Sequence, residues 1–349
     1  GFHWDITQAC NFRCNFCLTN SGKAGPGELS LERKLDLIER LFRVGVLYLK
    51  ILGGEPLVAP GALDVMRYAA ARGLHLLLST NGSRLSEAVV ASLAAIRANI
   101  RYLQVSLYGA TPAALARVAG SPRHFTAVQD GLRRLRDYDL RFTAMSVLCV
   151  ETLVDVVPLY RLARRAGAQA FRLTLKTDSG RGCAPGSFRK ATTDPEWRRL
   201  AGVLEALSGE QSDATPVSVQ ARPTFGEYLG REFGLAHYHS KCEAAIRYLY
   251  GDAAGNLAPC PFLANPNAHR AGDRLPVFPF NALRDDLLDV WHSPEFEQFR
   301  SLFRLSRNPM TFNRNCPRLG TEDCRPCVLS GCQCPAQIGT LRRARRSAA

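Results

Sequence analysis

The first two hundred residues alternate between short apolar runs and helical patterns, and this alternation restricts the fold more than any other feature. The apolar or extended runs predict six strands, at residues 2–7, 46–52, 74–79, 102–107, 142–150 and 170–175. Apolar side chains at helical spacing predict helices at residues 31–44, 62–72, 86–97, 125–138, 154–166 and 195–207. Because strand–helix–strand connections are right-handed, the alternation favours a parallel sheet.

The number of strand–helix units limits how such a sheet can close. Six units are fewer than the eight that complete a (β/α)8 barrel. We therefore expect an α/β chain built on an open, partial (β/α)6 TIM barrel, with its chemistry at the carboxyl ends of the strands. Continuous apolar runs are typical of strands buried on both faces. Periodicity alone leaves a flat, doubly wound sheet as the alternative.

The pattern changes after residue 208. Residues 208–218 are polar and lose their periodicity, which indicates a linker or boundary. We predict a partial barrel over residues 1–208, a linking segment over 209–240 and a small, cysteine-rich α+β domain over 241–349. Within the last part, residues 247–259 predict a hairpin and residues 283–303 one or two helices around Pro294.

The twelve cysteines are clustered. Three lie at positions 10, 14 and 17 and seven lie between 242 and 334, whereas Cys149 and Cys183 stand alone. No apolar signal-peptide core opens the sequence, and 349 residues are enough to bury a real core, so a disulfide framework is not favoured. Tight clusters of this kind are typical of metal or iron–sulfur ligation, while Cys149 is expected to be a core residue.

The chain is strongly basic, with a formal net charge of +14. This surplus favours an anionic partner such as an acidic peptide, phosphate or nucleic acid. Thiolate-bound iron–sulfur clusters would lower the charge, so we do not expect nucleic-acid binding. No apolar run reaches the ~18 to 20 residues that a membrane span needs. We expect a cytoplasmic protein that does not bind membranes.

Cys10, Cys14 and Cys17 form a C-x3-C-x2-C run just after the first predicted strand. Three thiolates leave one corner of a [4Fe–4S] cube without a protein ligand, and that open iron can chelate a small molecule and pass it an electron. Phe12 and Phe16 lie inside the run and could shield the cluster. The alternatives are a zinc site that lacks one ligand, or chance clustering.

This cysteine run resembles the signature of the radical S-adenosylmethionine (SAM) enzymes. A second motif, Gly53-Gly54-Glu55-Pro56, follows the second strand, where the superfamily carries GGE(P) against the methionine moiety of SAM. The glycines permit a close backbone approach, and the strand end presents carbonyls to an ammonium group. The resemblance implies that a reduced [4Fe–4S] cluster splits SAM into methionine and a 5′-deoxyadenosyl radical, which abstracts hydrogen from a substrate.

Other positions match the family more loosely. Ser79 and Asn81 at the end of strand three, and Ser106 at the end of strand four, resemble elements beside SAM, although ordinary loop capping explains them equally well. Tyr108 replaces a common aspartate. Arg172 on strand six is predicted to reach the cofactor, with a packing or surface role as the alternative.

The second cysteine group resembles the SPASM domain, an auxiliary-cluster extension of radical SAM enzymes. Its opening is C-x12-G-x4-C, from Cys242 to Cys260, and its later spacing departs from the family pattern. The predicted ligands are Cys242, Cys260, Cys316, Cys324, Cys327, Cys332 and Cys334. The resemblance implies one or two auxiliary [4Fe–4S] clusters, with a zinc knuckle at Cys324 and Cys327 as the alternative.

The resemblance also suggests the reaction class. Tyr108 and Asp178 are candidate acid–base or radical-relay residues, and Cys183 is a candidate hydrogen donor. SPASM enzymes often modify ribosomally made peptides by cross-linking, epimerisation or oxidation, and the basic charge favours a peptide with an acidic leader. A small-molecule dehydrogenase or decarboxylase and a non-enzymatic metal or electron-transfer module are the alternatives. An external reductant such as flavodoxin or ferredoxin is expected as a partner.

Overall fold

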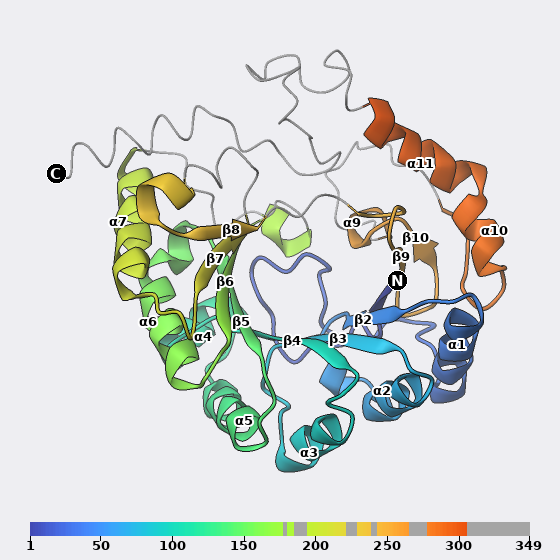
Figure 1. Cartoon of the computed structure of the whole chain (residues 1–349), viewed down its shortest axis with the longest axis horizontal. Helices are drawn as coiled ribbons and strands as arrows, with labels where there is room; N and C mark the ends of the chain where they lie inside the picture. Colours follow the sequence, from blue (N-terminus) through green and yellow to red (C-terminus); the bar gives the residue numbers. More distant parts are fainter. Residues whose placement is uncertain (177–179, 185–193, 221–228, 239–242, 265–277, 306–349) are drawn as a thin grey trace.

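The computed structural model describes residues 1–176, 180–184, 194–220, 229–238, 243–264 and 278–305 (Figure 1). The strands are β1 (Phe2–Asp5), β2 (Tyr48–Leu52), β3 (His75–Thr80), β4 (Ile100–Ser106), β5 (Thr143–Leu148), β6 (Ala170–Leu175), β7 (Val217–Gln220), β8 (Ala236–Tyr238), β9 (Leu249–Gly251) and β10 (Leu257–Ala258). The helices are α1 (Leu31–Arg43), α2 (Ala62–Ala71), α3 (Glu87–Ala95), α4 (Pro112–Ala119), α5 (Phe125–Asp137), α6 (Leu153–Arg165), α7 (Asp194–Glu210), α9 (Pro261–Ala264), α10 (Leu287–His292) and α11 (Pro294–Leu305). Short 3-10 turns are η1 (Pro56–Val58), η2 (Val150–Thr152) and η3 (Gly180–Cys183).

The ten strands form one sheet in the order β10-β9-β1-β2-β3-β4-β5-β6-β7-β8. From β1 to β8 each strand is parallel to the next one in the chain. A doubly wound sheet reverses its strand order at a switch point, and the run from β1 to β8 does not. Helices α1, α2, α3, α5, α6 and α7 cover its outer surface in Figure 1. The prediction of an open, partial barrel is therefore confirmed.

The segment expected to be a linker contributes to the sheet. Helix α7 continues to Glu210, and β7 and β8 then add two parallel strands beyond β6. The polar residues before Val217 obscured β7, yet Val217 and Val219 are buried and alternate with Ser218 and Gln220. Short strands with a polar inner face do not produce the apolar runs that marked the first six. The domain boundaries themselves stay a prediction.

The two faces of the barrel strands differ in chemistry. In β2 and β3 the residues facing the helices are buried and apolar, such as Leu49, Ile51 and Leu78. The alternate positions face inward and are only partly buried, and several are polar, including Lys50 and Ser79. Our expectation of strands buried on both faces was therefore wrong for the inner face. The inner face of β2 and β3 is therefore less completely buried than the face that packs against the helices.

The predicted hairpin over residues 247–259 is confirmed as β9 and β10. Strand β9 lies parallel to β1 on the side opposite β2, and β10 is antiparallel to β9. The His3 ring stacks on Tyr248, with ring centroids 3.6 Å apart, and the Trp4 indole Nε1 donates to the Asp252 carbonyl at 3.2 Å. Two helices were expected around Pro294, and the structure has them: α10 ends at His292 and α11 begins at Pro294. Among the helices described here, none is long and apolar enough to cross a membrane.

Candidate active site

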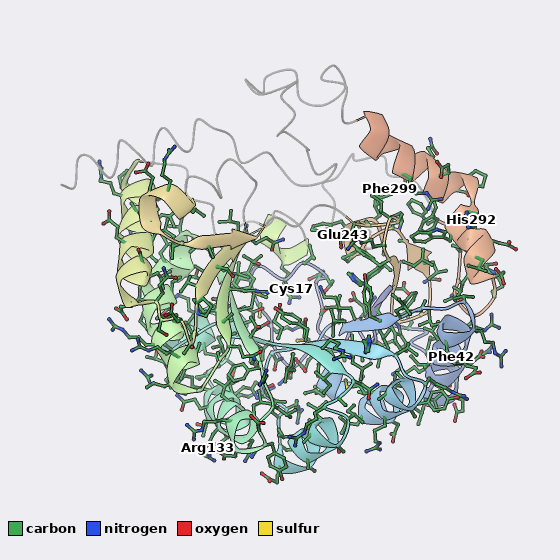
Figure 2. The ribbon with its side chains drawn as sticks, in the orientation of Figure 1. Cys17, Phe42, Arg133, Glu243, His292 and Phe299 are labelled. Atoms are coloured by element: carbon green, nitrogen blue, oxygen red, sulfur yellow. The ribbon has the colours of Figure 1, made fainter. Side chains whose placement is uncertain are left out.

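The cysteine loop follows β1 and lies inside the ring of strands, where Figure 2 labels Cys17. Its backbone is fixed at several points. The Cys10 amide donates to the Gly22 carbonyl at 2.9 Å, and the Arg13 amide donates to the Ala119 carbonyl at the end of α4 at 3.0 Å. The loop is thus held between its own return segment and the barrel wall.

The three thiols lie in an apolar setting. Cys14 is buried, and Phe12 and Phe16 are buried beside it. Burial raises the pKa of the Cys10 thiol to about 11 and raises the pKa of Cys14 as well. The free thiols of Cys10 and Cys14 are therefore protonated at neutral pH, so binding iron would release their protons.

Three thiols on one short, partly buried loop suit a [4Fe–4S] cluster, because such a cube takes each thiolate on a separate iron. A zinc site that lacks one ligand stays the alternative. Binding of a cluster by Cys10, Cys14 and Cys17 is still a prediction.

Arg181 joins the segment after β6 to the cysteine loop, and sequence reasoning missed it. Its Nε donates to the Cys14 carbonyl at 2.9 Å, and its NH1 donates to the Ser21 carbonyl at 2.8 Å. The Arg181 amide donates to the Cys17 carbonyl at 3.0 Å. A Cβ on the neighbouring Gly180 would lie 2.4 Å from that same carbonyl. Only its position in the glycine-rich turn after strand six could have indicated this role.

The Gly53-Gly54 pair allows β2 to end against the stem of the cysteine loop. The Gly54 amide donates to the Thr7 carbonyl at 2.8 Å, and the Glu55 amide donates to the Ala9 carbonyl at 2.8 Å. Gly53 has a φ of 127°, and a Cβ on Gly54 would lie 2.0 Å from the Ala9 carbonyl oxygen. Side chains at both positions are therefore excluded by the chain itself.

Glu55 is fully buried and its carboxylate holds the end of β3. It accepts hydrogen bonds from the Thr80 hydroxyl at 2.7 Å, the Asn81 amide at 2.6 Å and the Leu57 amide at 3.1 Å. Burial raises the pKa of Glu55, and these three donors oppose that shift. The Glu55 carboxylate therefore links the GGEP turn to the end of β3. Its contact with SAM, like that of Pro56 at the start of η1, stays a prediction.

Asn81 connects β3 to the cysteine loop. Its Nδ2 donates to the Asn11 Oδ1 at 2.9 Å, and the Ser83 hydroxyl donates to the Asn81 Oδ1 at 2.6 Å. The Asn11 Nδ2 closes the ring by donating to the Ser83 hydroxyl at 2.7 Å. Asn11 and Ser83 were not predicted, although Asn11 directly follows Cys10 in the sequence.

Tyr108 lies against the cysteine loop. Its ring meets Phe16 edge-on, with centroids 5.2 Å apart, and its hydroxyl bonds to Ser106. Burial raises the Tyr108 pKa far above its ordinary value, so the phenol stays protonated and is suited to donate a hydrogen bond. Ser79 faces inward on β3 opposite Gln104. The catalytic role of Tyr108 and the SAM contacts of Ser79 and Ser106 stay predictions.

Arg172 reaches across the inner face of the barrel. Its NH1 donates to the Tyr102 hydroxyl at 2.9 Å, and its guanidinium lies 5.1 Å from the centre of that ring. This contact shows an inward position, as predicted for a site residue. Contact with SAM is still a prediction.

The remaining cysteines divide into two groups. Cys149 belongs to the buried core, as expected, and Cys260 is buried at the end of β10. Cys183 ends η3, but its side chain is outside the described part of the chain. Asp178 and six further cysteines also lie outside the described residues, and these are Cys242, Cys316, Cys324, Cys327, Cys332 and Cys334.

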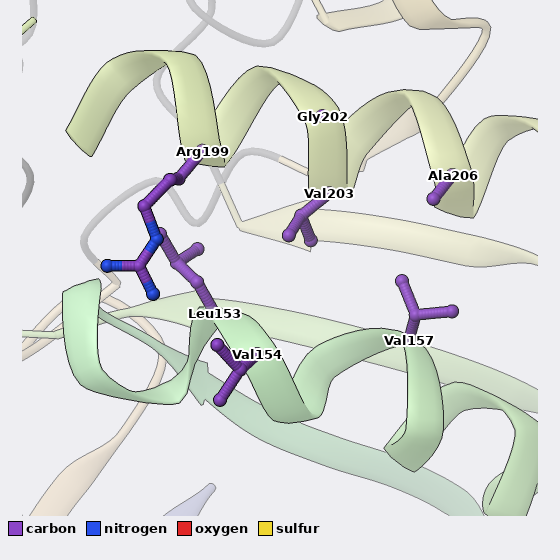
Figure 3. A pocket seen from close by; sticks show the side chains of 7 residues that line it. All are labelled: Leu153, Val154, Val157, Arg199, Gly202, Val203 and Ala206. Atoms are coloured by element: carbon purple, nitrogen blue, oxygen red, sulfur yellow. The ribbon is translucent and has the colours of Figure 1, made fainter. Parts of the chain in front are cut away.

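An apolar pocket on the outer wall is separate from this site. It lies between α6 and α7 (Figure 3) and is lined by Leu153, Val154, Val157, Arg199, Gly202, Val203 and Ala206. Its side chains carry no nucleophile or metal ligand.

Comparison with known proteins gives the family of the chain. Residues 4–163 match the family model of the radical SAM superfamily. The chain is 37% identical over 310 residues to mycofactocin maturase MftC of Mycobacterium tuberculosis, covering 88% of this chain and 72% of the relative. It is 24% identical over 348 residues to the AdoMet-dependent heme synthase of Methanosarcina barkeri, covering 97% and 92%. It is 26% identical over 340 residues to the PqqA peptide cyclase of Streptomyces rochei, covering 95% and 84%.

A solved structure shares the fold. The structure of anSMEcpe with bound AdoMet and the Cp18Cys peptide superposes with a TM-score of 0.65 at 14% identity, covering 99% of this chain and 96% of that one. The identity is low, so this likeness concerns the fold alone. It agrees with the parallel, open barrel described above.

Proposed function

Because the chain belongs to the radical SAM superfamily, we propose that it binds a [4Fe–4S] cluster through Cys10, Cys14 and Cys17 and modifies a ribosomally made peptide. The observation that carries the proposal is the three-thiol loop held inside an open parallel barrel, beside the GGEP turn. The family membership confirms the resemblance drawn from these two motifs.

The protein's own contribution is to hold and shield the reactants. When bound, the cluster supplies the electron that divides SAM into methionine and a 5′-deoxyadenosyl radical, which takes a hydrogen atom from the substrate. Phe12 and Phe16 keep water from the thiolates. Glu55 fixes the end of β3, and Asn81 ties that end to the cysteine loop, so that the cofactor surface is assembled before SAM arrives.

A peptide substrate is supported by the relatives and by the charge of the chain. One relative is a peptide cyclase, and the net charge of +14 suits a precursor with an acidic leader. The bond formed can be a cross-link, an epimerised centre or an oxidised side chain. A small-molecule dehydrogenase or decarboxylase is the second candidate, because the heme synthase matches nearly the full length of this chain.

We propose auxiliary clusters in the C-terminal region. Cys260 is buried next to the β9–β10 hairpin, which pairs with β1 and so joins this region to the barrel. Seven cysteines would serve one or two [4Fe–4S] clusters that exchange electrons with the substrate. Flavodoxin or ferredoxin would supply the reductant, and the expected cytoplasmic location stays a prediction.

Anaerobic reconstitution tests the proposal. The reduced enzyme should release 5′-deoxyadenosine from SAM, Cys14→Ala should abolish this release, and Cys149→Ala in the core should retain it. A short peptide encoded beside the gene should then change mass. Cross-linking removes two hydrogens, epimerisation in deuterated solvent adds deuterium, and decarboxylation releases carbon dioxide. SAM turnover with no change in any neighbouring peptide would contradict the peptide assignment and favour the small-molecule candidate.

A further inference from the structure

The pocket between α6 and α7 is apolar and belongs to no part of the candidate active site. It has a volume of about 290 Å³, which is near the lower end for ligand pockets and equals the space of about ten water molecules. Most of the side chains that line it are aliphatic, and Val154 is 60% exposed (Figure 3). Apolar groups of a partner that displaced water from this pocket would therefore bind favourably.

Gly202 keeps the middle of the pocket free of a side chain. It is exposed on α7, its backbone is not left-handed, and a Cβ at this position would meet no described atom of its surroundings within 4 Å. The fold itself therefore does not require glycine here, although glycine in a helix interior costs about 1 kcal/mol relative to alanine. The missing side chain instead allows a second polypeptide to lie close against α7.

The two ends of the pocket differ in charge. At one end Arg161 of α6 and Glu210 of α7 form an ion pair one turn beyond Val157 and Ala206, with Nε and Oε2 2.7 Å apart. At the other end Arg199 projects from α7 (Figure 3). Within the described residues, Arg199 forms no hydrogen bond and no ion pair. The pocket thus combines an apolar lining with one arginine that is available to an anion.

The Arg199 end of the pocket lies toward the mouth of the barrel. Figure 3 shows Arg199 beside Leu153, which begins α6 five residues after β5 ends at Leu148. The cysteine loop follows the carboxyl end of β1, and β1 and β5 belong to the same parallel run of strands. A peptide held in the pocket that continues past Arg199 would therefore reach the end of the barrel that carries the candidate site.

We propose that the α6–α7 pocket binds the leader of the peptide substrate, an inference that rests on the proposed function. Apolar side chains of the leader occupy the pocket, and an aspartate or glutamate beside them pairs with the planar guanidinium of Arg199. The net charge of +14 attracts an acidic segment and opposes the pairing of two copies of this chain. Because α6 and α7 lie outside the sheet and the cysteine loop lies inside it, this face is poorly placed for an electron donor to the cluster (Figure 1).

Fluorescence anisotropy with three labelled heptapeptide amides tests the proposal on the full chain, with its cluster loaded and not reduced. The acidic apolar probe is Glu-Leu-Leu-Glu-Leu-Leu-Glu. The second probe has glutamine in place of every glutamate, and the third has serine in place of every leucine. The acidic apolar probe should bind about tenfold more tightly than either of the others.

Variants of α7 locate the binding. Gly202→Leu fills the pocket and should weaken binding of the acidic apolar probe at least about tenfold. Gly209→Leu is the matched control, because Gly209 is also exposed on α7 with open space around a Cβ but does not line the pocket. Arg199→Gln should remove the preference for glutamate over glutamine, and Arg199→Lys should retain part of it. Arg198→Gln makes the same change of charge at an exposed position outside the pocket and should keep the preference.

The leucine variants replace a helical glycine, so both should unfold at a temperature no lower than that of the wild type. If Gly202→Leu does not fold, the pair of substitutions at Arg199 and Arg198 still decides whether the charge at the pocket is recognised. Failure of the proposed function is separate, because probe binding needs neither SAM cleavage nor turnover.

Four results would overturn the proposal. Equal affinity for the glutamate and glutamine probes would show that charge is not recognised, and wild-type affinity in Gly202→Leu would place the binding elsewhere. Binding that does not saturate by about 1 mM would show that the pocket holds no peptide of this chemistry. A wild-type dimer that Gly202→Leu converts to monomers in analytical ultracentrifugation would assign the pocket to contact between copies.

Discussion

Replacing Glu55 with glutamine should disconnect the GGEP turn from the end of β3. The carboxylate accepts one hydrogen bond on Oε2, from the Asn81 amide, and two on Oε1, from Leu57 and Thr80. A glutamine can keep the pair on Oε1 only by turning its NH2 group toward the Asn81 amide. Two donors would then face each other in a buried site.

The magnitude follows from that single lost contact. Leaving a buried donor without an acceptor costs about 1–3 kcal/mol, and the bond lost here is short and accepted by a carboxylate. With an unfolding entropy of about 2.1 cal/mol/K per residue, this corresponds to a fall in Tm of roughly 1–4 °C for the 349-residue chain. Because the same change loosens Asn81, the dissociation constant for SAM should rise about tenfold.

Differential scanning fluorimetry and SAM binding by equilibrium dialysis, both under anaerobic conditions, measure the two effects. Glu87→Gln is the matched control, because that side chain is 67% exposed at the start of α3 and should change the free energy of unfolding by less than about 0.5 kcal/mol. An E55Q protein with the Tm and SAM affinity of the wild type would refute the role of Glu55 as the link between β2 and β3.

Three further substitutions probe separate parts of the account. Burial raises the pKa of Asp5 from 3.8 to about 7, so the folded state keeps a proton that the unfolded state loses, and the free energy of unfolding falls as pH rises between these two values. Asp5→Asn removes this dependence. Between pH 5.5 and 7.5 its free energy of unfolding should therefore rise by about 2 kcal/mol relative to that of the wild type, as measured by denaturant unfolding. Arg181→Gln removes the hydrogen bonds that hold the cysteine loop, so the rate at which a chelator removes iron should rise several-fold. An unchanged rate would show that these hydrogen bonds do not stabilise the bound cluster. Gly54→Ala places a Cβ 2.0 Å from the Ala9 carbonyl oxygen and should prevent cluster loading, so an iron content equal to that of wild type would contradict the packing described.

Much of the barrel could be predicted because its first six strands have strong local signals. The runs at β2 and β3 contain buried leucine and isoleucine at alternate positions, and the helices between them carry regular apolar spacing. Strands β7 and β8 could not be predicted in the same way, because they have only four and three residues, and β7 depends on pairing with β6 and β8 on pairing with β7. Their stability comes from the neighbouring strand and not from their own sequence.

The residues of the candidate site likewise include some that sequence spacing reveals and some that only the folded structure reveals. Cys10 and Gly53 are marked by spacing, since a cluster and a close backbone approach need particular residue types at fixed distances along the chain. Arg181 carries no such mark, because its contacts arise only when the segment after β6 is brought to the cysteine loop. A lone basic residue in a basic chain gives no signal until its neighbours in space are known.

The electron paramagnetic resonance spectrum of the reduced enzyme, recorded with and without SAM, tests whether the cysteine loop holds a cluster with an open iron. If Cys10, Cys14 and Cys17 leave one iron open, SAM will shift the signal of the wild-type cluster, and the shift will be absent in Cys14→Ala. A signal that SAM leaves unchanged, or a cysteine loop filled with zinc after anaerobic purification, would contradict it.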